Sequence, residues 1–284
     1  MPILERTTSV LASGLAFGEG PRWHARLLWV SDMHANRVVT VDDAGRVDRV
    51  VRVAGRPSGL GWLPDERMLI VSMEDRRLLR YDGRSLETHA DLSELAAHDI
   101  NDLVVDGEGR AYVSQFGFDL HHQGEFAKTE ILLVQPDGRA RAAAGELAFP
   151  NGMVITPDGR TLIVGESYAA RLTAFDIGED GSLANRRVFA KLEGATPDGI
   201  CLDADGCVWA ASPTSRECLR VREGGEILER VRTDTLSIAC MLGGADRRTL
   251  YVLTSESVDP EECVKKRSAR VETVKVDVPG AGWP

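Results

Sequence analysis

Short apolar segments of about five residues, rich in Val, Ile, Leu, Trp and Tyr, recur along the chain with turn residues between them. One unit consists of an apolar strand, a turn such as Pro-Asp-Gly-Arg, a second apolar strand, a polar loop and a third strand that ends in Asp. The Asp-Gly and Gly-Gly dipeptides supply the positive φ that tight hairpins require. The pattern therefore predicts antiparallel β-meanders.

This unit is repeated, with successive copies starting about 40 to 50 residues apart, the length of a propeller blade. Six copies begin at Gly18, Pro57, Ile100, Pro150, Pro197 and Ala239. A lone four-stranded sheet cannot bury both of its faces, whereas six sheets packed around an axis can. We expect an all-β fold, a six-bladed β-propeller of four-stranded antiparallel blades, formed by residues 1–284 as a single domain.

The two ends of the chain have the composition of strands, over residues 3–11 and 271–278. We expect the N-terminal strand to join the final blade and close the ring. Helix signals are weak, and only residues 91–99 have a cap-like start with periodic apolar positions. This segment predicts a short helical turn inside a loop.

Charge and composition narrow the classes of partner. The 44 acidic and 34 basic residues give a net charge of -10, which disfavours a nucleic acid partner. No apolar run is long enough for a membrane span, and the first 20 residues lack the pattern of a secretory signal. The five cysteines lack zinc-site spacing and are expected to be free thiols. These features predict a cytoplasmic protein that contacts no membrane.

Equivalent residues at the start of each innermost strand form a ring around the axis of a propeller. In the aligned copies these residues are Glu19, Ser58, Asn101, Asn151, Asp198 and Ala239. Four carry carboxylate or amide oxygens, the donors that hard cations prefer, and two carboxylates match the charge of a dication. Asn and Asp before Gly can also simply form turns, which is the structural alternative.

We expect Glu19, Asn151 and Asp198 to hold one divalent metal ion on the axis. Their oxygens favour Ca²⁺, Mg²⁺ or Mn²⁺ over a structural Zn²⁺. Calcium is the preferred candidate, and magnesium, manganese or zinc are the alternatives.

At these residues the chain resembles the SMP-30/gluconolactonase/LRE-like family, also called the regucalcin family, over about residues 10 to 278. The marks of the resemblance are GEGPRW with Glu19, PNGM with Asn151, PDGICLD with Asp198, and the segment GSLANRRVFAKLEGATPDG. The resemblance implies a six-bladed propeller, a metal bound by these three residues, and hydrolysis of a lactone. It also implies that Asn101 lies beside the metal and the substrate.

Two positions depart from the family pattern. Asp99 stands where sugar-lactone members typically carry an arginine that holds substrate hydroxyls, and Leu103 replaces the glycine of the usual Asn-Asp-Gly. The substrate could therefore be more apolar than a sugar lactone, or of another class.

The expected mechanism is metal-assisted attack of water on the substrate carbonyl. Asp198 is the candidate general base, because one of its oxygens can face the water while the other binds the metal. A metal-bound hydroxide is the alternative base. Asn101 would orient the substrate or a water molecule.

Polar loops that leave the same face supply candidate substrate contacts. These candidates are Asn101, Asp99, His34, Phe118 and Tyr168. His34 could reach the substrate or serve as an accessory acid or base, and the alternative is a solvated loop residue. The insert over residues 116–128 is expected to form a wall at the mouth of the channel, with His121 and His122 on its surface.

Two rival functions remain open at this stage. The ring could be a non-catalytic binding platform, in which case no dication would bind. The same metal could also serve hydrolysis of an ester or phosphotriester, epoxide opening or a cyclisation, because fold does not fix function. A small-molecule lactone or ester is the expected partner, and oligomeric state is not predicted.

Overall fold

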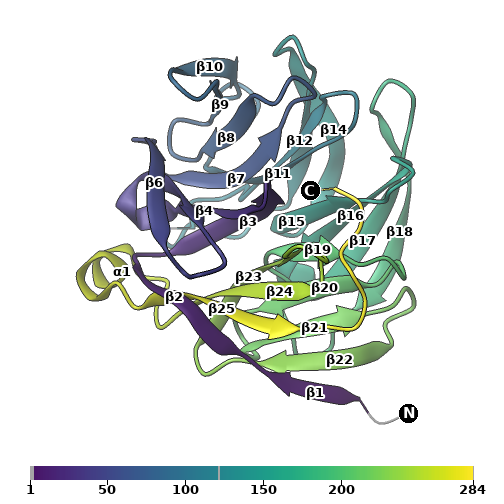
Figure 1. The fold of residues 1–284 in the computed structure, drawn as a ribbon. Coiled ribbons are helices and arrows are strands. Elements are labelled where there is room, and N and C mark those ends of the chain that lie inside the picture. Colours follow the sequence, from purple (N-terminus) through teal and green to yellow (C-terminus); the bar gives the residue numbers. More distant parts are fainter. Residues whose placement is uncertain (1–2, 121, 284) are drawn as a thin grey trace.

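The computed structural model describes residues 3–120 and 122–283. Six small sheets surround a common centre, which confirms the predicted six-bladed β-propeller (Figure 1). Blades 1 to 4 are each built from four consecutive antiparallel strands. These strands are β3 (Gly18–His24), β4 (Leu27–Asp32), β5 (Arg37–Val41) and β6 (Val47–Arg52); β7 (Pro57–Trp62), β8 (Met68–Ser72), β9 (Arg77–Tyr81) and β10 (Leu86–Asp91); β11 (Ile100–Val105), β12 (Ala111–Gln115), β13 (Thr129–Val134) and β14 (Ala140–Leu147); and β15 (Pro150–Ile155), β16 (Thr161–Glu166), β17 (Arg171–Ile177) and β18 (Leu183–Lys191).

The last two blades also contain strands from the N-terminus. Blade 5 comprises β19 (Ile200–Leu202), β20 (Val208–Ser212), β21 (Glu217–Val221), β22 (Ile227–Arg232) and β1 (Leu4–Thr7), and blade 6 comprises β23 (Leu236–Gly243), β24 (Thr249–Ser255), β25 (Ala269–Lys275) and β2 (Ser9–Leu15). Strand β2 pairs antiparallel with β25, which confirms that the N-terminal strand closes the ring. The single strand expected over residues 3–11 is wrong, because β1 separates at Thr8 and pairs in parallel with β22.

The innermost strands β3, β7, β11, β15, β19 and β23 lie side by side around the centre in this order, and β23 packs against β3 (Figure 1). Two glycines show why these strands can approach so closely. A Cβ on Gly59 would lie 2.3 Å from the backbone nitrogen of Leu103, and a Cβ on Gly199 would lie 2.3 Å from Cβ of Ala239. The Gly that follows several ring residues therefore permits close packing of the innermost strands.

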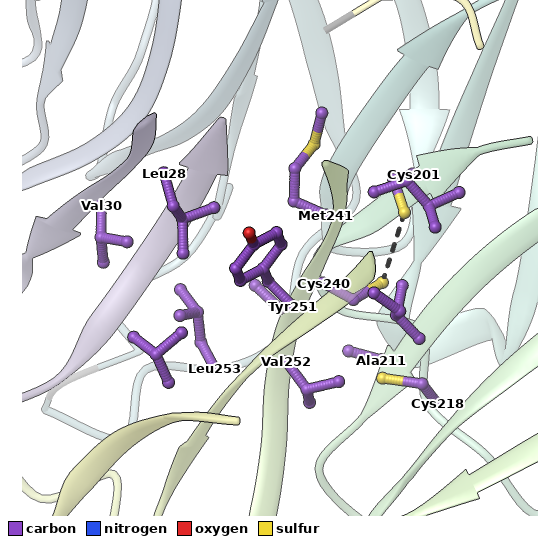
Figure 2. Close-up of a cluster of buried hydrophobic side chains, with 14 of the residues drawn as sticks. Leu28, Val30, Cys201, Ala211, Cys218, Cys240, Met241, Tyr251, Val252 and Leu253 are labelled. Carbon is purple, nitrogen blue, oxygen red and sulfur yellow. Dashed lines mark hydrogen bonds between the residues drawn. The ribbon is translucent and has the colours of Figure 1, made fainter. Parts of the chain in front are cut away.

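The hydrophobic core lies between blades, in clusters that combine side chains of neighbouring sheets. Figure 2 shows one cluster, in which Leu28 and Val30 of blade 1 meet Tyr251 and Leu253 of blade 6. All five cysteines lie in the described residues, are buried and form no disulfide, as expected. The Sγ atoms of Cys201 and Cys240 are 3.9 Å apart inside this cluster (Figure 2).

Helices are few and differ from the prediction. Residues 91–99 form turns in which the Ala96 N–H donates to the Leu92 carbonyl, and no helix is assigned there. The described residues contain one α-helix, α1 (Pro260–Lys266), and two 3-10 turns, η1 (Met33–Ala35) and η2 (Ser167–Ala169). Asp259 caps α1 by accepting from the Glu262 N–H, a signal that the sequence carries. Within residues 3–120 and 122–283, no helix is long and apolar enough to cross a lipid bilayer.

Candidate metal centre

The predicted ring residues meet at one end of the innermost strands, which we call the site mouth. The Asn101 Nδ2 group donates to Asn151 Oδ1 at 2.9 Å, which joins blade 3 to blade 4. The Ser58 hydroxyl lies 3.4 Å from Asn101 Oδ1, which extends the contact to blade 2. Both asparagines are buried, at 5% and 7% exposure. The structure thus brings residues from separate repeats together, as the alignment of the copies predicts.

Glu19 and Asp198 approach this network from blades 1 and 5. Burial, followed by the negative charges of Asp198 and Asp102, raises the pKa of Glu19 well above its ordinary value. Burial and the charge of Asp102 raise the pKa of Asp198 to about 8, and a hydrogen bond from Asn151 offsets this only in part. Two carboxyl groups therefore share one region with like charges around them, an arrangement that favours binding of a cation.

The fit of these residues to a metal ion can be judged from the donor atoms. Within residues 3–120 and 122–283, Asp198 Oδ1 is shielded from solvent and has no hydrogen-bond partner. A buried carboxylate oxygen without a donor is costly, and a bound dication would satisfy it. Glu19, Asn151 and Asp198 offer only oxygen donors, which suit a hard cation such as Ca²⁺ or Mg²⁺. The residues present therefore fit one divalent ion.

The ring is poor in the ligands that softer metals prefer. No group of three or more His, Cys, Asp or Glu side chains with metal-binding geometry occurs among the described residues. Glu19 and Asp198 contribute two such side chains, and the other oxygens come from asparagine amides and serine hydroxyls. A set of oxygen donors like this one is typical of sites for hard cations, whereas structural zinc sites use cysteine and histidine.

A third carboxylate, Asp102, was not assigned a role from the sequence. Asp102 is buried, and its Oδ1 accepts from Arg22 Nη2 at 2.7 Å and from the Leu103 N–H at 2.7 Å. Arg22 also donates to the Leu103 carbonyl at 2.6 Å and is 3% exposed. The pair links blade 1 to blade 3 beneath the ring. Arg22 and Asp102 belong to the motifs GEGPRW and IND, from which roles are predicted for their neighbours Glu19 and Asn101. That the arginine and the acid meet is visible only in the folded chain.

Two predicted substrate contacts, His34 and Asp99, line clefts on the same face. His34 lies in η1 with its ring 5.0 Å from that of Phe17, and it borders a cleft of about 490 Å³ beside α1. Asp99 borders a second, polar cleft of about 520 Å³ with His98 and Asp119, and its carbonyl accepts from the Phe116 N–H at 3.0 Å. Neither cleft is lined by a ring residue, so both residues lie outside the network of ring residues.

The other two predicted contacts, Phe118 and Tyr168, meet each other. Their ring centroids are 5.7 Å apart. Tyr168 belongs to η2, directly after Ser167, whose hydroxyl lies 3.4 Å from Asn151 Nδ2 and donates to the Pro197 carbonyl at 2.7 Å. Tyr168 is therefore the neighbour in the sequence of a residue, Ser167, that contacts the ring residue Asn151. The insert over 116–128 contributes Phe118 to the rim; His122 is exposed and bonds Asp119, and His121 lies outside the described residues.

Glu166, two residues before Tyr168 in the sequence, is fully buried and has its own partners. It accepts from the Ala148 N–H at 2.8 Å and from Arg171 at 2.9 Å. Burial opposes ionisation, yet these donors and the Thr173 hydroxyl lower the pKa of Glu166. Glu166 is therefore a structural anchor for the chain that enters blade 4 and does not line the rim.

Comparison with known proteins places these observations in a family. The model of the SMP-30/Gluconolactonase/LRE-like region matches residues 17–256. A 6-deoxy-6-sulfogluconolactonase of Pseudomonas putida is 28% identical over 298 residues, spanning 99% of this chain and 98% of that protein. A regucalcin of Xenopus laevis is 26% identical, spanning 91% of this chain and 89% of that protein.

Solved structures show the same fold. A calcium-binding regucalcin of Agrobacterium tumefaciens superposes with a TM-score of 0.83 at 21% identity, covering 100% of this chain and 99% of that one. A gluconolactonase of Xanthomonas campestris gives a TM-score of 0.75 at 24% identity, covering 95% and 88%. Because the family model spans most of the propeller and all the ring residues, the chain belongs to the SMP-30/Gluconolactonase/LRE-like family.

Proposed function

We propose that this protein hydrolyses a lactone or a closely related ester with the help of one divalent cation held by Glu19, Asn151 and Asp198. The observation that carries the proposal is the meeting of two carboxyl groups, one with an unpartnered oxygen within the described residues, beside amide oxygens at the centre of the ring. The relatives named sulfogluconolactonase and gluconolactonase support the reaction class, and the regucalcin described as calcium-binding supports Ca²⁺ as the ion.

When bound, the cation would act as a Lewis acid toward the substrate carbonyl oxygen. Asp198 is the general base in this proposal. Its raised pKa, about 8 in the chain without metal, reflects a carboxyl group that readily takes a proton, and a ligating cation would lower that pKa again. The Asp198 oxygen that does not bind the cation would receive the proton of the attacking water.

Asn101 would orient the substrate. One of its two side-chain N–H groups donates a hydrogen bond to Asn151, and we assign the other as a donor to an oxygen of the substrate. The Ser58 contact and the buried position of Asn101 hold the amide in one orientation. A fixed donor costs less entropy on binding than a mobile one, so it favours a single substrate pose.

Arg22 and Asp102 have a supporting role in the proposal. A buried Asp102 without a cation would add a third negative charge near Glu19 and Asp198. The Arg22 guanidinium neutralises it through the 2.7 Å contact. The net charge left at the ring is then close to that of the two carboxylates, which matches one dication.

Location and domain structure belong to the proposal as well. We propose that residues 1–284 act as one propeller domain in the cytoplasm, with a small-molecule substrate and no nucleic acid or membrane partner. The net charge of -10 supports the absence of a nucleic acid partner.

Metal binding and turnover together test the proposed function. The purified chain, stripped with a chelator, is titrated with Ca²⁺, Mg²⁺, Mn²⁺ and Zn²⁺ by calorimetry and thermal unfolding. Each form is then assayed on sugar lactones, aliphatic lactones and aryl esters. Asp198→Ala should lose both the metal response and hydrolysis, while the surface control Glu226→Gln should keep both. A chain that binds no cation would favour a binding platform, and an active Asp198→Ala variant would show that the site is elsewhere.

A further inference from the structure

Five aromatic rings gather at the site mouth on the side of blades 3 and 4. We call this set the aromatic cluster; it consists of Phe116, Phe118, Phe126, Phe149 and Tyr168. Neighbouring ring centroids lie between 4.9 and 5.8 Å apart, the range of direct aromatic contact. The rings come from the β12–β13 connection, from the residue before β15, and from η2, so the fold assembles them from three separate segments.

Phe149 lies at the centre of the aromatic cluster. Its ring stacks on Phe116 at 4.9 Å and on Tyr168 at 5.0 Å, with interplanar angles of 21° and 26°. Its φ of 57° is in the left-handed region, which is costly for a large side chain. The buried acid Glu166 holds the preceding Ala148 N–H and helps to maintain this conformation. Strain of this kind persists where the surroundings enforce it, often at functional sites.

The aromatic cluster adjoins the proposed reaction centre. Phe149 is two residues before Asn151, and Tyr168 follows Ser167, which lies within hydrogen-bond distance of Asn151. Phe118 is buried, whereas Phe126 is 43% exposed and Tyr168 is 54% exposed. The inner rings thus pack tightly while the outer two present apolar faces beside the site mouth.

The chemistry of these rings discriminates between kinds of substrate. Four phenylalanines and one tyrosine offer large apolar surfaces and a single hydroxyl group. A polyhydroxylated sugar chain placed there would lose hydrogen bonds to water without replacement, which is unfavourable. A planar aromatic group would instead gain ring contacts and bury apolar area. Asp99 itself supplies no cationic donor for sugar hydroxyls; the arginines of its cleft are Arg56 and Arg76.

We propose that the substrate is a lactone or ester that carries an aromatic group, and that this group packs against Tyr168 and Phe126. The inference rests on the proposed hydrolytic function and names its substrate class. The carbonyl group would lie toward Asn101 and Asn151, and the aromatic group toward the outer rings of the cluster. No covalent step is added to the reaction.

The test compares two lactones of equal ring size. Dihydrocoumarin contains a fused benzene ring and δ-valerolactone does not, and glucono-δ-lactone represents the sugar class. Dihydrocoumarin releases a phenolate and is intrinsically more reactive, so its kcat/KM relative to that of δ-valerolactone is compared between the metal-loaded parent chain and its variants. Tyr168→Ala should reduce the dihydrocoumarin to δ-valerolactone ratio by about 10-fold, and Tyr168→Phe should preserve it because the ring remains. Val188→Ala, an exposed apolar site on β18, is the matched control and should leave the ratio unchanged.

A binding measurement without turnover separates this inference from the proposed function. The lactams 3,4-dihydroquinolin-2-one and δ-valerolactam resemble the two lactones but resist hydrolysis, and calorimetry gives their affinities. Tighter binding of the aromatic lactam, lost in Tyr168→Ala, supports the inference even if no lactone is hydrolysed. Preference for glucono-δ-lactone, or a ratio that Tyr168→Ala does not change, overturns the inference and leaves the hydrolytic function standing. A change in oligomeric state of Tyr168→Ala on gel filtration, without a change in ratio, would instead identify the outer rings as a protein contact.

Discussion

Two pairs of acids lie at the same mouth of the propeller, and their surroundings are opposite. Asp32 and Glu166 end the second strands of blades 1 and 4, where each has an arginine partner: Arg37 at 2.8 Å and Arg171 at 2.9 Å. Each also accepts backbone N–H groups from the segment that leads into the innermost strand, at Ala16 and Ala148. These two acids are neutralised inside the protein and fix its loops.

Glu19 and Asp198 are less well compensated: Glu19 accepts from the Gly20 N–H at 3.0 Å and lies near the charge of Arg22, and Asp198 accepts from Asn151. Burial and the charges of neighbouring acids outweigh these interactions and raise the pKa of each carboxyl group, whereas the donors around Glu166 lower its pKa. A buried acid with an arginine partner needs nothing from outside the chain. A pair of acids with raised pKa values needs protons or a cation. The acids with arginine partners therefore stabilise the fold, whereas Glu19 and Asp198 are available to bind a cation.

The largest effect should follow removal of a ring carboxylate. Glu19→Gln keeps the size of the side chain but removes one negative charge and weakens the oxygen donors. We expect divalent cation affinity to fall by at least about 100-fold, since even indirect partners of a metal ligand are worth 10- to 100-fold. Calorimetric titration of the chelator-treated variant measures this. Unchanged affinity would place the cation away from Glu19.

The pH dependence of the metal-free protein should also separate the two pairs. The pKa of Asp198 is about 8 in the folded chain and near 3.8 when unfolded, so between these values the folded state holds more protons. Stability contributed by this group is therefore lost as pH rises from about 4 to 8, with a slope of at most about 1.4 kcal/mol per pH unit. Urea unfolding from pH 5 to 8 with chelator present measures the slope.

Asp198→Asn is the control for that slope. The variant cannot titrate at this position, so its stability should change less over the same pH range. Addition of a saturating dication to the unmodified chain should remove the loss at high pH, because the ion replaces the protons. Identical slopes for the variant and the unmodified chain would contradict the electrostatic argument.

Arg22→Met tests whether Asp102 belongs with the neutralised acids. The variant leaves Asp102 buried near Glu19 and Asp198 without its cation, which should cost about 3 kcal/mol of unfolding free energy. The double variant Arg22→Met with Asp102→Asn should regain part of that loss. Chemical denaturation of both variants measures the effect, and equal stability of the single variant and the parent would argue against a structural ion pair.

Glu166→Gln should produce a smaller loss, of about 2 kcal/mol, because the arginines left behind are about one-third exposed and can be solvated. Its cation affinity should equal that of the unmodified chain, in contrast to Glu19→Gln. Parallel denaturation and calorimetry measure the two quantities. A large loss of cation affinity in Glu166→Gln would show that the two pairs of acids are not independent.

Much of the architecture could be predicted from local patterns. Strand-length apolar segments, hairpin turns and a regular repeat are short-range features, so they predicted six blades and the start of the innermost strand in blades 1 to 4. Strands β19 and β23 begin three residues away from the predicted starts at Pro197 and Ala239. Alignment of the copies then predicted that Glu19, Asn101, Asn151 and Asp198 would meet, and the structure brings these residues together. Their roles as ligands and catalytic groups stay predictions.

Other features escaped the sequence reasoning for identifiable reasons. The strand β1 joins blade 5 by pairing with β22, where Leu4 lies opposite Glu229, and no local signal marks a pairing between residues so distant in the sequence. The helix α1 has a local signal, a capping Asp259 followed by Pro260 and acidic residues, so the expectation that only residues 91–99 carry a helix signal is wrong. Residues 91–99 form turns in which the N–H groups of Leu95 and Ala96 both donate to the Leu92 carbonyl, and no helix continues from them.

The sequence by itself determined the repeat, the positions of the innermost strands and the oxygen-rich chemistry of the ring, because these depend on residues close together along the chain. The tertiary structure alone decided which acids receive an arginine. Asp102 meets Arg22, and Glu166 meets Arg171, while Glu19 and Asp198 meet each other. Charge pairing depends on distances of a few ångströms between blades, and those distances exist only after the ring has closed.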